Sequence, residues 1–310
     1  MKNKKIAILG ASSHIAKGLI FNFMHSEGFE LFLFARFPEK VKKFLKENNL
    51  ASKYHIYKFE RFFSGKYDVV INCVGLGTPI KVKQASGQVF KLTEDFDNLS
   101  LAYLLAHPKV LYINFSSGAA YCSSFNQKVN RNSKLSISVS NIKPENYYGI
   151  AKIYSEAKHR ALDKLKIVDI RIFSYFSRFI DLEGGYFITD MLRSLKKKDT
   201  FITSHHDFVR DFLSPQDLFN LIYLIIRSKP FNGAIDAYSS APISKFKLLD
   251  YFVKHHSLKY VFDRDFKFWP TGGKSLYYSS SKKAASLGYK PKFSSLKTVV
   301  TESEYILKGN

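Results

Sequence analysis

Short apolar runs alternate with amphipathic segments along the first part of the chain. The runs are rich in Ile, Val, Leu and Phe, which is typical of strands buried on both faces of a sheet. The segments between them carry apolar residues at helical spacing. This alternation predicts an α/β fold in which helices flank a doubly wound parallel sheet. The expected strands are 4–10, 29–34, 55–57, 68–75, 110–115 and 168–173, and the expected helices include 14–26, 38–48, 96–106 and one across 148–165.

The alternation loosens beyond residue 175. A helix is expected at 187–197, a second begins after Ser214 and ends at Arg227, and a short strand follows at 233–238. We therefore expect a dinucleotide-binding domain at 1–175 and a mainly substrate-binding domain at 176–310. The smaller C-terminal domain is interleaved with the first, because residues 205–240 are expected to return to it.

The N-terminal strand, turn and helix form a unit with recognisable chemistry. The strand ends at Gly10, and Ser12 or Ser13 can cap the helix that follows. A helix N-terminus offers free N–H groups and a positive dipole end to a pyrophosphate. This opening is typical of a Rossmann-type dinucleotide-binding fold. Candidate cofactor-binding residues lie at this turn and at the end of the fourth strand: Gly10, Ser12, Ser13, His14, Ile15, Cys73, Val74 and Gly75.

The second expected strand ends in Phe34-Ala35-Arg36. Folds of this type that use NAD place a carboxylate at this point, which holds the ribose 2′-hydroxyl. Arginine can instead pair with a 2′-phosphate. Arg36 therefore favours NADP(H) as cofactor, with NAD(H) as the alternative; an ordinary exposed arginine after a strand would look the same.

The composition is 45% apolar and 24% charged, as expected for a globular protein. The net charge of +22 is carried mainly by dispersed lysines, without a helix-turn-helix, zinc-finger or RNA-binding motif. We therefore expect no nucleic-acid partner. The positive field favours anionic substrates instead.

Further sequence features indicate the cellular compartment and whether the protein binds a metal. The two cysteines form no disulfide or zinc pattern. No apolar run is long enough to span a membrane, and the basic start leads into a strand rather than a signal peptide. We expect a cytoplasmic protein without a membrane partner. The adjacent His205 and His206 do not have the spacing of a metal-binding pair, so no metal site is expected.

Tyr148 and Lys152 are the central candidates for chemistry. They are four residues apart and therefore lie on one helix face. Taken alone, such a pair is also typical of an exposed helix surface. The fifth expected strand delivers Ser117 to the carboxyl edge of the sheet, where Arg36 also falls. Ligands of doubly wound sheets bind at this edge.

Together these segments resemble the extended short-chain dehydrogenase/reductases, and within them the NAD-dependent epimerase/dehydratase family of nucleotide-sugar enzymes. Residues 116–121 are similar to the family's Ser-Ser-x-x-x-Tyr segment, and Tyr148 with Lys152 is similar to its Tyr-x-x-x-Lys pair. Residues 210–218 and 283–291 resemble two further family segments. The likeness covers nearly the whole chain.

The chain departs from the family pattern at several positions. The second and third glycines of the family motif are Ser13 and Ala16, and Ser174 replaces an asparagine after the sixth strand. A side chain at Ser13 stands where the backbone approaches the pyrophosphate, so either the cofactor shifts, which would weaken its retention, or the hydroxyl contacts the phosphate. Asp97 and Asn98 compete for the position of an asparagine that often supports the catalytic lysine.

The resemblance implies roles for three residues. Tyr148 would exchange a proton with a carbonyl oxygen, and Ser117 would hold that oxygen by a hydrogen bond. Lys152 would favour the ionised phenol and bind the nicotinamide ribose. Family 4,6-dehydratases carry a carboxylate pair directly after the catalytic Ser or Thr, whereas Gly118 and Ala119 follow Ser117 here.

We therefore expect NADPH-dependent reduction of an NDP-4-keto-6-deoxysugar, as in surface polysaccharide or deoxysugar biosynthesis. A 4-epimerase with tightly held NAD is the alternative within the family. A further alternative is a dinucleotide-binding regulator without catalysis, although such regulators characteristically lose the tyrosine and the lysine that this chain keeps.

The resemblance also implies partners. Arg210 is expected to contact the substrate diphosphate, since an arginine fork suits phosphate; a structural pair with Asp211 or Asp217 is the alternative. Arg178 and Tyr278 are further substrate-binding candidates. A homodimer formed through two helices of each subunit is typical of the family.

Overall fold

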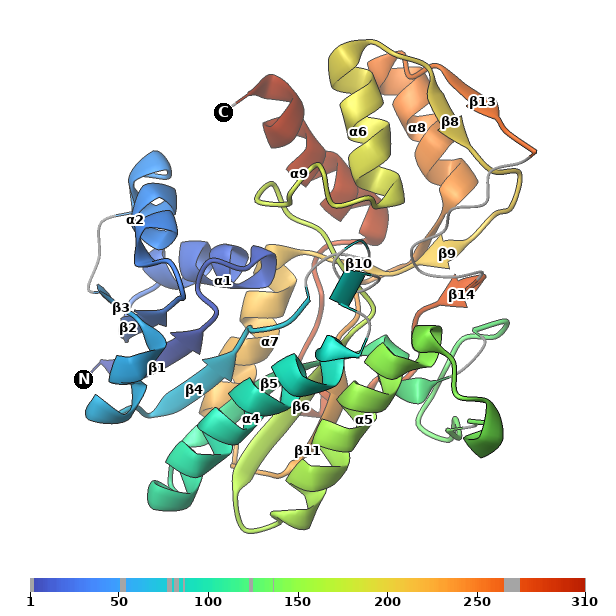
Figure 1. The fold of residues 1–310 in the computed structure, drawn as a ribbon. Helices are drawn as coiled ribbons and strands as arrows, with labels where there is room; N and C mark the ends of the chain where they lie inside the picture. Colours follow the sequence, from blue (N-terminus) through green and yellow to red (C-terminus); the bar gives the residue numbers. More distant parts are fainter. Residues whose placement is uncertain are drawn as a thin grey trace.

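The computed structural model describes residues 3–50, 54–76, 80, 84–85, 87–122, 125–135, 137–264 and 274–309. In this part of the chain, parallel strands form one sheet in the order β11-β6-β5-β4-β1-β2-β3 (Figure 1). This order, with a reversal beside β1, confirms the predicted Rossmann-type α/β fold. The strands of the sheet are β1 (Lys4–Leu9), β2 (Phe29–Phe34), β3 (Tyr54–Tyr57), β4 (Val69–Asn72), β5 (Leu111–Ser117), β6 (Lys166–Ile172) and β11 (Gly233–Asp236).

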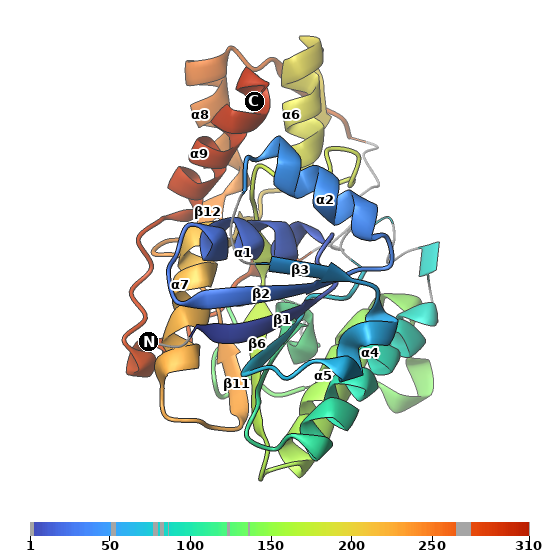
Figure 2. The ribbon, with the colours of Figure 1, turned by 90° about the vertical axis from the view of Figure 1, so that its left-hand side faces the viewer.

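Helices cover both faces of this sheet. Figure 2 shows α1 and α2 on one side of β1, β2 and β3, and α4 and α5 on the other. The helix α7 packs beside α1 in the same apolar core. The bounds of these helices are α1 (His14–Met24), α2 (Pro38–Glu47), α4 (Gln88–Ala106), α5 (Pro144–Ala161) and α7 (Pro215–Arg227).

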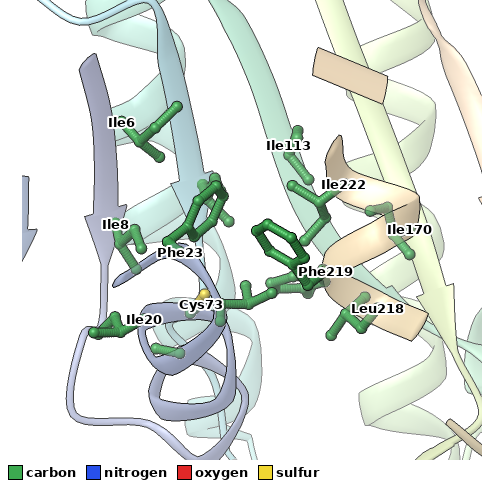
Figure 3. Close-up of a cluster of buried hydrophobic side chains, with 14 of the residues drawn as sticks. Ile6, Ile8, Ile20, Phe23, Cys73, Ile113, Ile170, Leu218, Phe219 and Ile222 are labelled. Carbon is green, nitrogen blue, oxygen red and sulfur yellow. The ribbon is translucent and has the colours of Figure 1, made fainter. Parts of the chain in front are cut away.

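The core between the sheet and the α1–α7 layer is built from aromatic and branched side chains (Figure 3). The ring of Phe23 on α1 meets the ring of Phe219 on α7 edge to face, with the centroids 5.0 Å apart. Ile8, Ile113 and Ile170 project from three strands into the same layer. Removing these side chains from water supplies the main favourable term that holds the sheet to its helices.

A smaller group of elements lies beyond the carboxyl edge of the sheet, at the top of Figure 1. Its helices α6, α8 and α9 share a separate core that contains Met191, Leu249 and Val299. The remaining elements are α6 (Phe187–Lys197), α8 (Lys245–His256), α9 (Ser295–Lys308), β7 (Ser174–Tyr175), β8 (Phe201–Thr203), β9 (Val209–Arg210), β10 (Phe212–Leu213), β12 (Ile243–Ser244), β13 (Tyr260–Phe262), β14 (Leu276–Tyr277), and the 3-10 helices η1 (Phe59–Ser64), η2 (Gly118–Tyr121), η3 (Val139–Asn141) and η4 (Lys283–Leu287).

Most predicted elements are present near their expected bounds. The helix at 187–197 has the predicted limits, and Ser214 caps α7 by accepting the N–H of Asp217. One prediction was wrong in extent, since α4 begins at Gln88 rather than at residue 96. Its first turns are solvated, with an exposed Lys91–Asp95 pair, so the stretch lacks an obvious apolar stripe. The helix predicted across 148–165 ends at Ala161.

Residues 215–236 contribute β11 to the large sheet, where it pairs with β6, and α7 to the helical layer that packs on it. The predicted division into two domains at residue 175 stays a prediction. Within the described residues, no helix has both the length and the apolar character that a membrane span requires.

Candidate active site

The turn after β1 brings Gly10 against the end of β4. Gly10 has a φ of +74°, the left-handed region that favours glycine. A Cβ there would lie 3.0 Å from the carbonyl of Cys73 and 3.0 Å from Cγ2 of Val74. Ser13 caps α1, because its hydroxyl accepts the N–H of Ala16 at 3.3 Å, while Ser12 is exposed. The remaining N–H groups of the first turn point out of the helix end, where an anion can bind.

His14 adds no positive charge to this turn. Its Nε2 lies 2.7 Å from Oγ of Ser177, and the ring of Tyr175 packs edge-on at 4.9 Å. The pKa of His14 is lowered to about 3, chiefly by burial and in part by the charge of Lys17, while the bond to Ser177 opposes the shift. The imidazole is therefore neutral at neutral pH, and Ile15 beside it is half-buried against the core. Anion binding at the turn depends on backbone N–H groups.

The segment after β4 forms the opposite wall. The side chain of Asn72 accepts the N–H of Val74 at 3.0 Å and donates to Oη of Tyr112 at 3.1 Å, which fixes the path of the chain. Burial raises the pKa of the Cys73 thiol, so it stays neutral. No described residue lies within 4 Å of a Cβ placed on Gly75. Among the described residues, none covers the backbone at Gly75, which leaves room there for a ligand.

Arg36 lies two residues after the end of β2 and is exposed. The carbonyl of Phe34 accepts the N–H of Ala11 at 2.9 Å, so the end of β2 lies beside the turn that follows β1. The side chain of Arg36 therefore starts at the edge of the sheet where the glycine turn lies. This is the placement that the sequence predicts, and its role toward a 2′-phosphate stays a prediction.

Helix α5 presents Tyr148 and Lys152 to the end of β5. The buried Lys152 donates from Nζ to the carbonyl of Phe115 at 2.9 Å, and Nζ lies 5.7 Å from the centroid of the Tyr148 ring. Gly149 allows a close approach of α5 to η2, since a Cβ there would lie 2.5 Å from the carbonyl oxygen of Ala119. The pair is thus directed toward the sheet and is not an exposed surface pair.

Ser117, the last residue of β5, lies at the same place. Its Oγ is 3.2 Å from Oη of Tyr277 and also accepts the N–H of Ala119 at 3.2 Å. Burial raises the pKa of Tyr277, the hydrogen bond to Ser117 lowers it, and nearby Tyr148 raises it. The structure therefore gathers Ser117, Tyr148 and Lys152 around one point at the carboxyl edge of the sheet.

Two tyrosines of this cluster, Tyr186 and Tyr277, were not predicted from the sequence. Burial, with Tyr148 and Tyr277 close by, raises the pKa of Tyr186, which precedes α6. Tyr186 and Tyr277 therefore remain protonated at neutral pH. The predicted residue was Tyr278, but the neighbouring Tyr277 contacts Ser117. Successive residues of a strand point to opposite faces, and strand alternation is the signal that could have separated the two tyrosines.

The two predicted arginines lie in different surroundings. Arg178 donates from Nε and Nη2 to the carboxylate of Glu302 at 2.9 and 2.8 Å, and its guanidinium stacks on Tyr305. This forked pair fastens α9 and lies outside the Ser117 cluster. Arg210 is buried, and its guanidinium lies 5.7 Å from the centroid of the Tyr277 ring. It therefore belongs to the same cluster as Ser117.

The two carboxylates named as structural partners of Arg210 serve other groups. Asp217 accepts the N–H groups of Lys292 and Phe293 at 2.9 and 3.0 Å. Asp211 accepts the N–H of Ser239 at 3.0 Å. Both acids hold the chain around α7 and β11 in place.

A buried ion pair lies behind the cluster. Arg171 on β6 binds both carboxylate oxygens of Glu156 on α5, and Ser116 donates its hydroxyl to the same carboxylate. Oδ1 of Asp236 lies 3.6 Å from Nη1 of Arg171, and Oδ2 accepts a hydrogen bond from the hydroxyl of Tyr121 at 2.8 Å. These contacts tie α5, β5, β6 and β11 together. Glu156, which follows Lys152 by one helical turn, was not predicted from the sequence.

Asp97, rather than Asn98, faces the interior between α4 and α5. Its Oδ1 lies 2.7 Å from Nε2 of His159, whose Nδ1 lies 2.9 Å from Asp169. Burial lowers the pKa of His159, but the hydrogen bonds and charges of Asp169 and Asp97 outweigh burial and raise it to about 9. A charged imidazolium therefore joins α5 to α4 and β6. Asn98 instead accepts from Lys158 at 2.7 Å.

Solved structures share this architecture over nearly their whole length. UDP-glucose 4-epimerase from Thermotoga maritima has 18% identity and a TM-score of 0.80, with coverage of 98% of this chain and 99% of that one. A mutant of UDP-glucuronic acid 4-epimerase from Bacillus cereus has 16% identity and a TM-score of 0.79, covering 99% and 100%. dTDP-glucose 4,6-dehydratase from Bacillus anthracis has 12% identity and a TM-score of 0.75, with coverage of 98% of this chain and 97% of that one. At these identities the likeness shows the fold alone.

The sequence itself carries the family assignment. No curated protein matches the chain closely enough to be informative. The sequence model of the NAD dependent epimerase/dehydratase family matches residues 6–237, a segment that runs from β1 through β11 and includes Ser117, Tyr148 and Lys152. Because this match covers most of the chain, the protein belongs to the NAD dependent epimerase/dehydratase family.

Proposed function

We propose that this protein is an NADPH-dependent reductase of the 4-keto group of a nucleotide-linked 6-deoxysugar. The observation that carries the proposal is the convergence of Ser117, Tyr148 and Lys152 at the sheet edge, together with Arg36 at the end of β2. Membership of the family supports a nicotinamide cofactor and a nucleotide-sugar substrate. Solved structures of the same fold contain NAD and UDP-sugars, which agrees with this class of ligands.

The residues of the turn fit a dinucleotide. The absence of a side chain at Gly10 lets the turn after β1 lie close to Cys73 and Val74 at the end of β4. The capped N-terminus of α1 can bind a pyrophosphate. Arg36 would hold the 2′-phosphate, and the open backbone at Gly75 would face the cofactor. When bound, the reduced nicotinamide supplies a hydride to the substrate carbon.

The side chains of the protein supply position and a proton. Ser117 donates a hydrogen bond to the substrate carbonyl oxygen, and Tyr148 transfers its phenolic proton to that oxygen. The ammonium of Lys152, fixed by the carbonyl of Phe115, stabilises the negative charge left on the phenol. Tyr277, in contact with Ser117, orients the serine hydroxyl.

The surroundings of Ser117 argue against a dehydratase. A Cβ on Gly118 would lie 2.4 Å from Cδ1 of Phe173, so a carboxylate side chain has no room at this position. The elimination of water needs an acid and a base at this end of the site. Reduction needs only the proton donor that Tyr148 provides.

A 4-epimerase is the second candidate, because the solved structures with the same fold include 4-epimerases with NAD bound. The epimerase and the reductase differ in whether the cofactor stays bound between turnovers. An epimerase regenerates its NAD in each cycle, whereas a reductase exchanges NADPH after each turnover.

Incubation with NADPH and a panel of NDP-4-keto-6-deoxysugars tests the proposal. We expect loss of the nicotinamide absorbance together with a new 4-hydroxyl group in the product. Protein that retains stoichiometric NAD through gel filtration and interconverts 4-epimers without consuming NADPH would establish the epimerase instead.

A further inference from the structure

The carboxylate of Asp236, at the end of β11, joins two distant parts of the chain. Its Oδ2 accepts the hydroxyl of Tyr121 at 2.8 Å and the hydroxyl of Ser279 at 2.5 Å. Asp236, Tyr121 and Ser279 are 3%, 8% and 4% exposed. Because a buried carboxylate that lacks hydrogen-bond donors is costly, both hydroxyls are bound firmly to this acid.

Each of the two hydroxyls belongs to a segment that carries one partner of the contact between Ser117 and Tyr277. Tyr121 is the last residue of η2, the 3-10 helix that begins directly after Ser117. Ser279 follows Tyr277, the last residue of β14, by two residues. Oγ of Ser117 lies 3.2 Å from Oη of Tyr277, although the two residues are 160 positions apart. One carboxylate oxygen therefore fastens both segments close to this contact.

The phenol of Tyr121 is the donor in its bond to Asp236. Burial and the charge of Asp236 raise the pKa of Tyr121, and these effects outweigh the opposing charge of Arg171. The phenol therefore keeps its proton at neutral pH. The guanidinium of Arg171 lies 4.8 Å from the centroid of the same ring, and its Nη1 lies 3.6 Å from Oδ1 of Asp236. This opposite charge compensates the buried carboxylate.

Apolar packing fills the space between the two segments. The ring of Phe173 contacts both tyrosines, with its centroid 6.2 Å from that of Tyr121 and 5.3 Å from that of Tyr277. Apolar packing of this kind is not directional, whereas a hydrogen bond restricts both the distance and the angle of its donor. The bonds to Asp236 therefore determine the relative position of the two segments.

We propose that Asp236 is a positioning residue for the reaction: by binding Tyr121 and Ser279 it sets the contact between Ser117 and Tyr277, and thereby the direction of the Ser117 hydroxyl. This inference rests on the role of Ser117 in the proposed function. Asp236 acts through the two hydroxyls and not on the reacting atoms. A displacement of a catalytic group by about 1 Å lowers turnover by about 100-fold.

Tyr121→Phe and Ser279→Ala each remove one hydroxyl and leave Asp236 in place. We expect kcat with the keto-sugar to fall about 10- to 100-fold in each variant. KM for NADPH should stay unchanged, because the cofactor turn at Gly10 lies outside both segments. The double variant should lose little more than either single variant, since the contact requires both segments to be held.

Three outcomes of these measurements would overturn the proposal. Unchanged kcat in both single variants would show that the bonds to Asp236 do not position Ser117. Losses of kcat and of NADPH affinity by the same factor would show a general loss of structure. Losses that multiply in the double variant would show that the two hydroxyls act separately.

Two control variants remove comparable hydroxyls. Tyr103 on α4 is 1% exposed and donates to the carbonyl of Gly65 at 3.0 Å, so Tyr103→Phe breaks a buried bond elsewhere. The hydroxyl of Ser280 donates to the carbonyl of Val129 at 3.3 Å, which the N–H of Ser280 already binds at 2.8 Å. Both Tyr103→Phe and Ser280→Ala should keep the wild-type kcat. A loss in Tyr103→Phe as large as in Tyr121→Phe would assign the effect to stability alone.

Hydrogen exchange measured by mass spectrometry gives a readout that does not depend on the reaction. The N–H of Ala119 donates to Oγ of Ser117 at 3.2 Å, so exchange in residues 118–122 reports on this serine. Exchange should rise about tenfold in residues 118–122 of Tyr121→Phe and in residues 276–281 of Ser279→Ala, because each segment loses a buried hydrogen bond. Wild-type exchange in both variants would overturn the proposal. Raised exchange in a protein that reduces no keto-sugar would refute the reductase and leave the action of Asp236 on the Ser117–Tyr277 contact standing.

Discussion

The guanidinium of Arg171 forks onto the carboxylate of Glu156, directly behind the residues proposed for catalysis. Nε lies 2.9 Å from Oε1 and 3.1 Å from Oε2, and Glu156 is 2% exposed. Ser116 donates to the same carboxylate from the end of β5. Because Glu156 follows Lys152 by one helical turn, the pair holds the catalytic face of α5 against β5 and β6.

Glu156→Ala should therefore lower stability and activity together. Removal of one partner leaves Arg171, whose side chain is only 20% exposed, with the more distant Asp236 opposite it. Breaking a buried pair in this way costs about 3–5 kcal/mol. Urea denaturation monitored by circular dichroism measures the loss, and NADPH consumption should fall because α5 loses its support.

An exposed pair provides the control. Lys91 and Asp95 form an i, i+4 pair on α4, and the side chain of Asp95 is 51% exposed. Asp95→Ala should cost at most about 1 kcal/mol, because water solvates the remaining lysine. A Glu156→Ala variant that loses no more than Asp95→Ala would show that the buried pair does not hold α5.

Tyr148→Phe should abolish most of the turnover without loss of fold. The substitution removes only the hydroxyl that carries the transferred proton, and general acid catalysis contributes about 10²- to 10⁴-fold. The measurement is kcat with NADPH and a keto-sugar, at unchanged cofactor affinity. Tyr147→Phe is the matched control, because the ring of Tyr147 packs at a tilt against Phe90, with the centroids 5.5 Å apart. Equal losses in both variants would contradict a role for the Tyr148 proton.

The sequence was informative where local patterns determine the structure. The apolar periodicity predicted the strands and helices of the sheet, and the glycine turn and the Tyr148–Lys152 spacing predicted which edge carries the site. Each of these motifs spans only a few residues, so the spacing within it determines its geometry.

The substrate side could not be predicted in the same way. Ser117 and Tyr277 are 160 residues apart in sequence, and their contact depends on the pairing of two-residue strands. A strand this short has no periodicity to detect. Tyr186 likewise lies outside any motif, and only the assembled fold shows that it shares a cluster with Ser117.

Because the buried imidazolium of His159 stabilises the folded state, the free energy of unfolding should fall at alkaline pH. Its pKa is raised from the usual 6.5 to about 9, so the folded state binds the proton more tightly than the unfolded state does. This contribution is complete below pH 6.5 and is lost as the pH rises through about 9. The shift corresponds to a free energy on the order of 3 kcal/mol.

Denaturation of the wild type at pH 6, 7.5 and 9, values chosen around that window, should show a falling free energy of unfolding. His159→Gln should be less stable at the lowest pH and should lack most of this decline. His25→Gln, at an exposed position after α1, should keep the decline of the wild type. The same slope in His159→Gln would place its origin in another group.

Arg36→Ala should weaken the preference for NADPH. Loss of a charge-assisted contact to the 2′-phosphate is expected to lower kcat/KM for NADPH by about 10- to 100-fold, while the value for NADH stays unchanged. Arg131→Ala removes another exposed arginine and should change neither value. If Arg36→Ala lowers both values equally, the arginine does not recognise the 2′-phosphate.

Gly149→Ala should separate the catalytic helix from η2. The added Cβ would lie 2.5 Å from the carbonyl oxygen of Ala119 and 2.9 Å from Sγ of Cys122, and the first neighbour is backbone that cannot rotate away. Such overpacking costs about 1–3 kcal/mol. Because Tyr148 is the preceding residue, kcat should fall as the helix shifts. Gly87→Ala is the control, since no described residue lies within 4 Å of a Cβ at Gly87, and it should leave both thermal stability and kcat close to those of the wild type. A Gly149→Ala protein with wild-type kcat would mean that contact between α5 and η2 does not set the position of Tyr148.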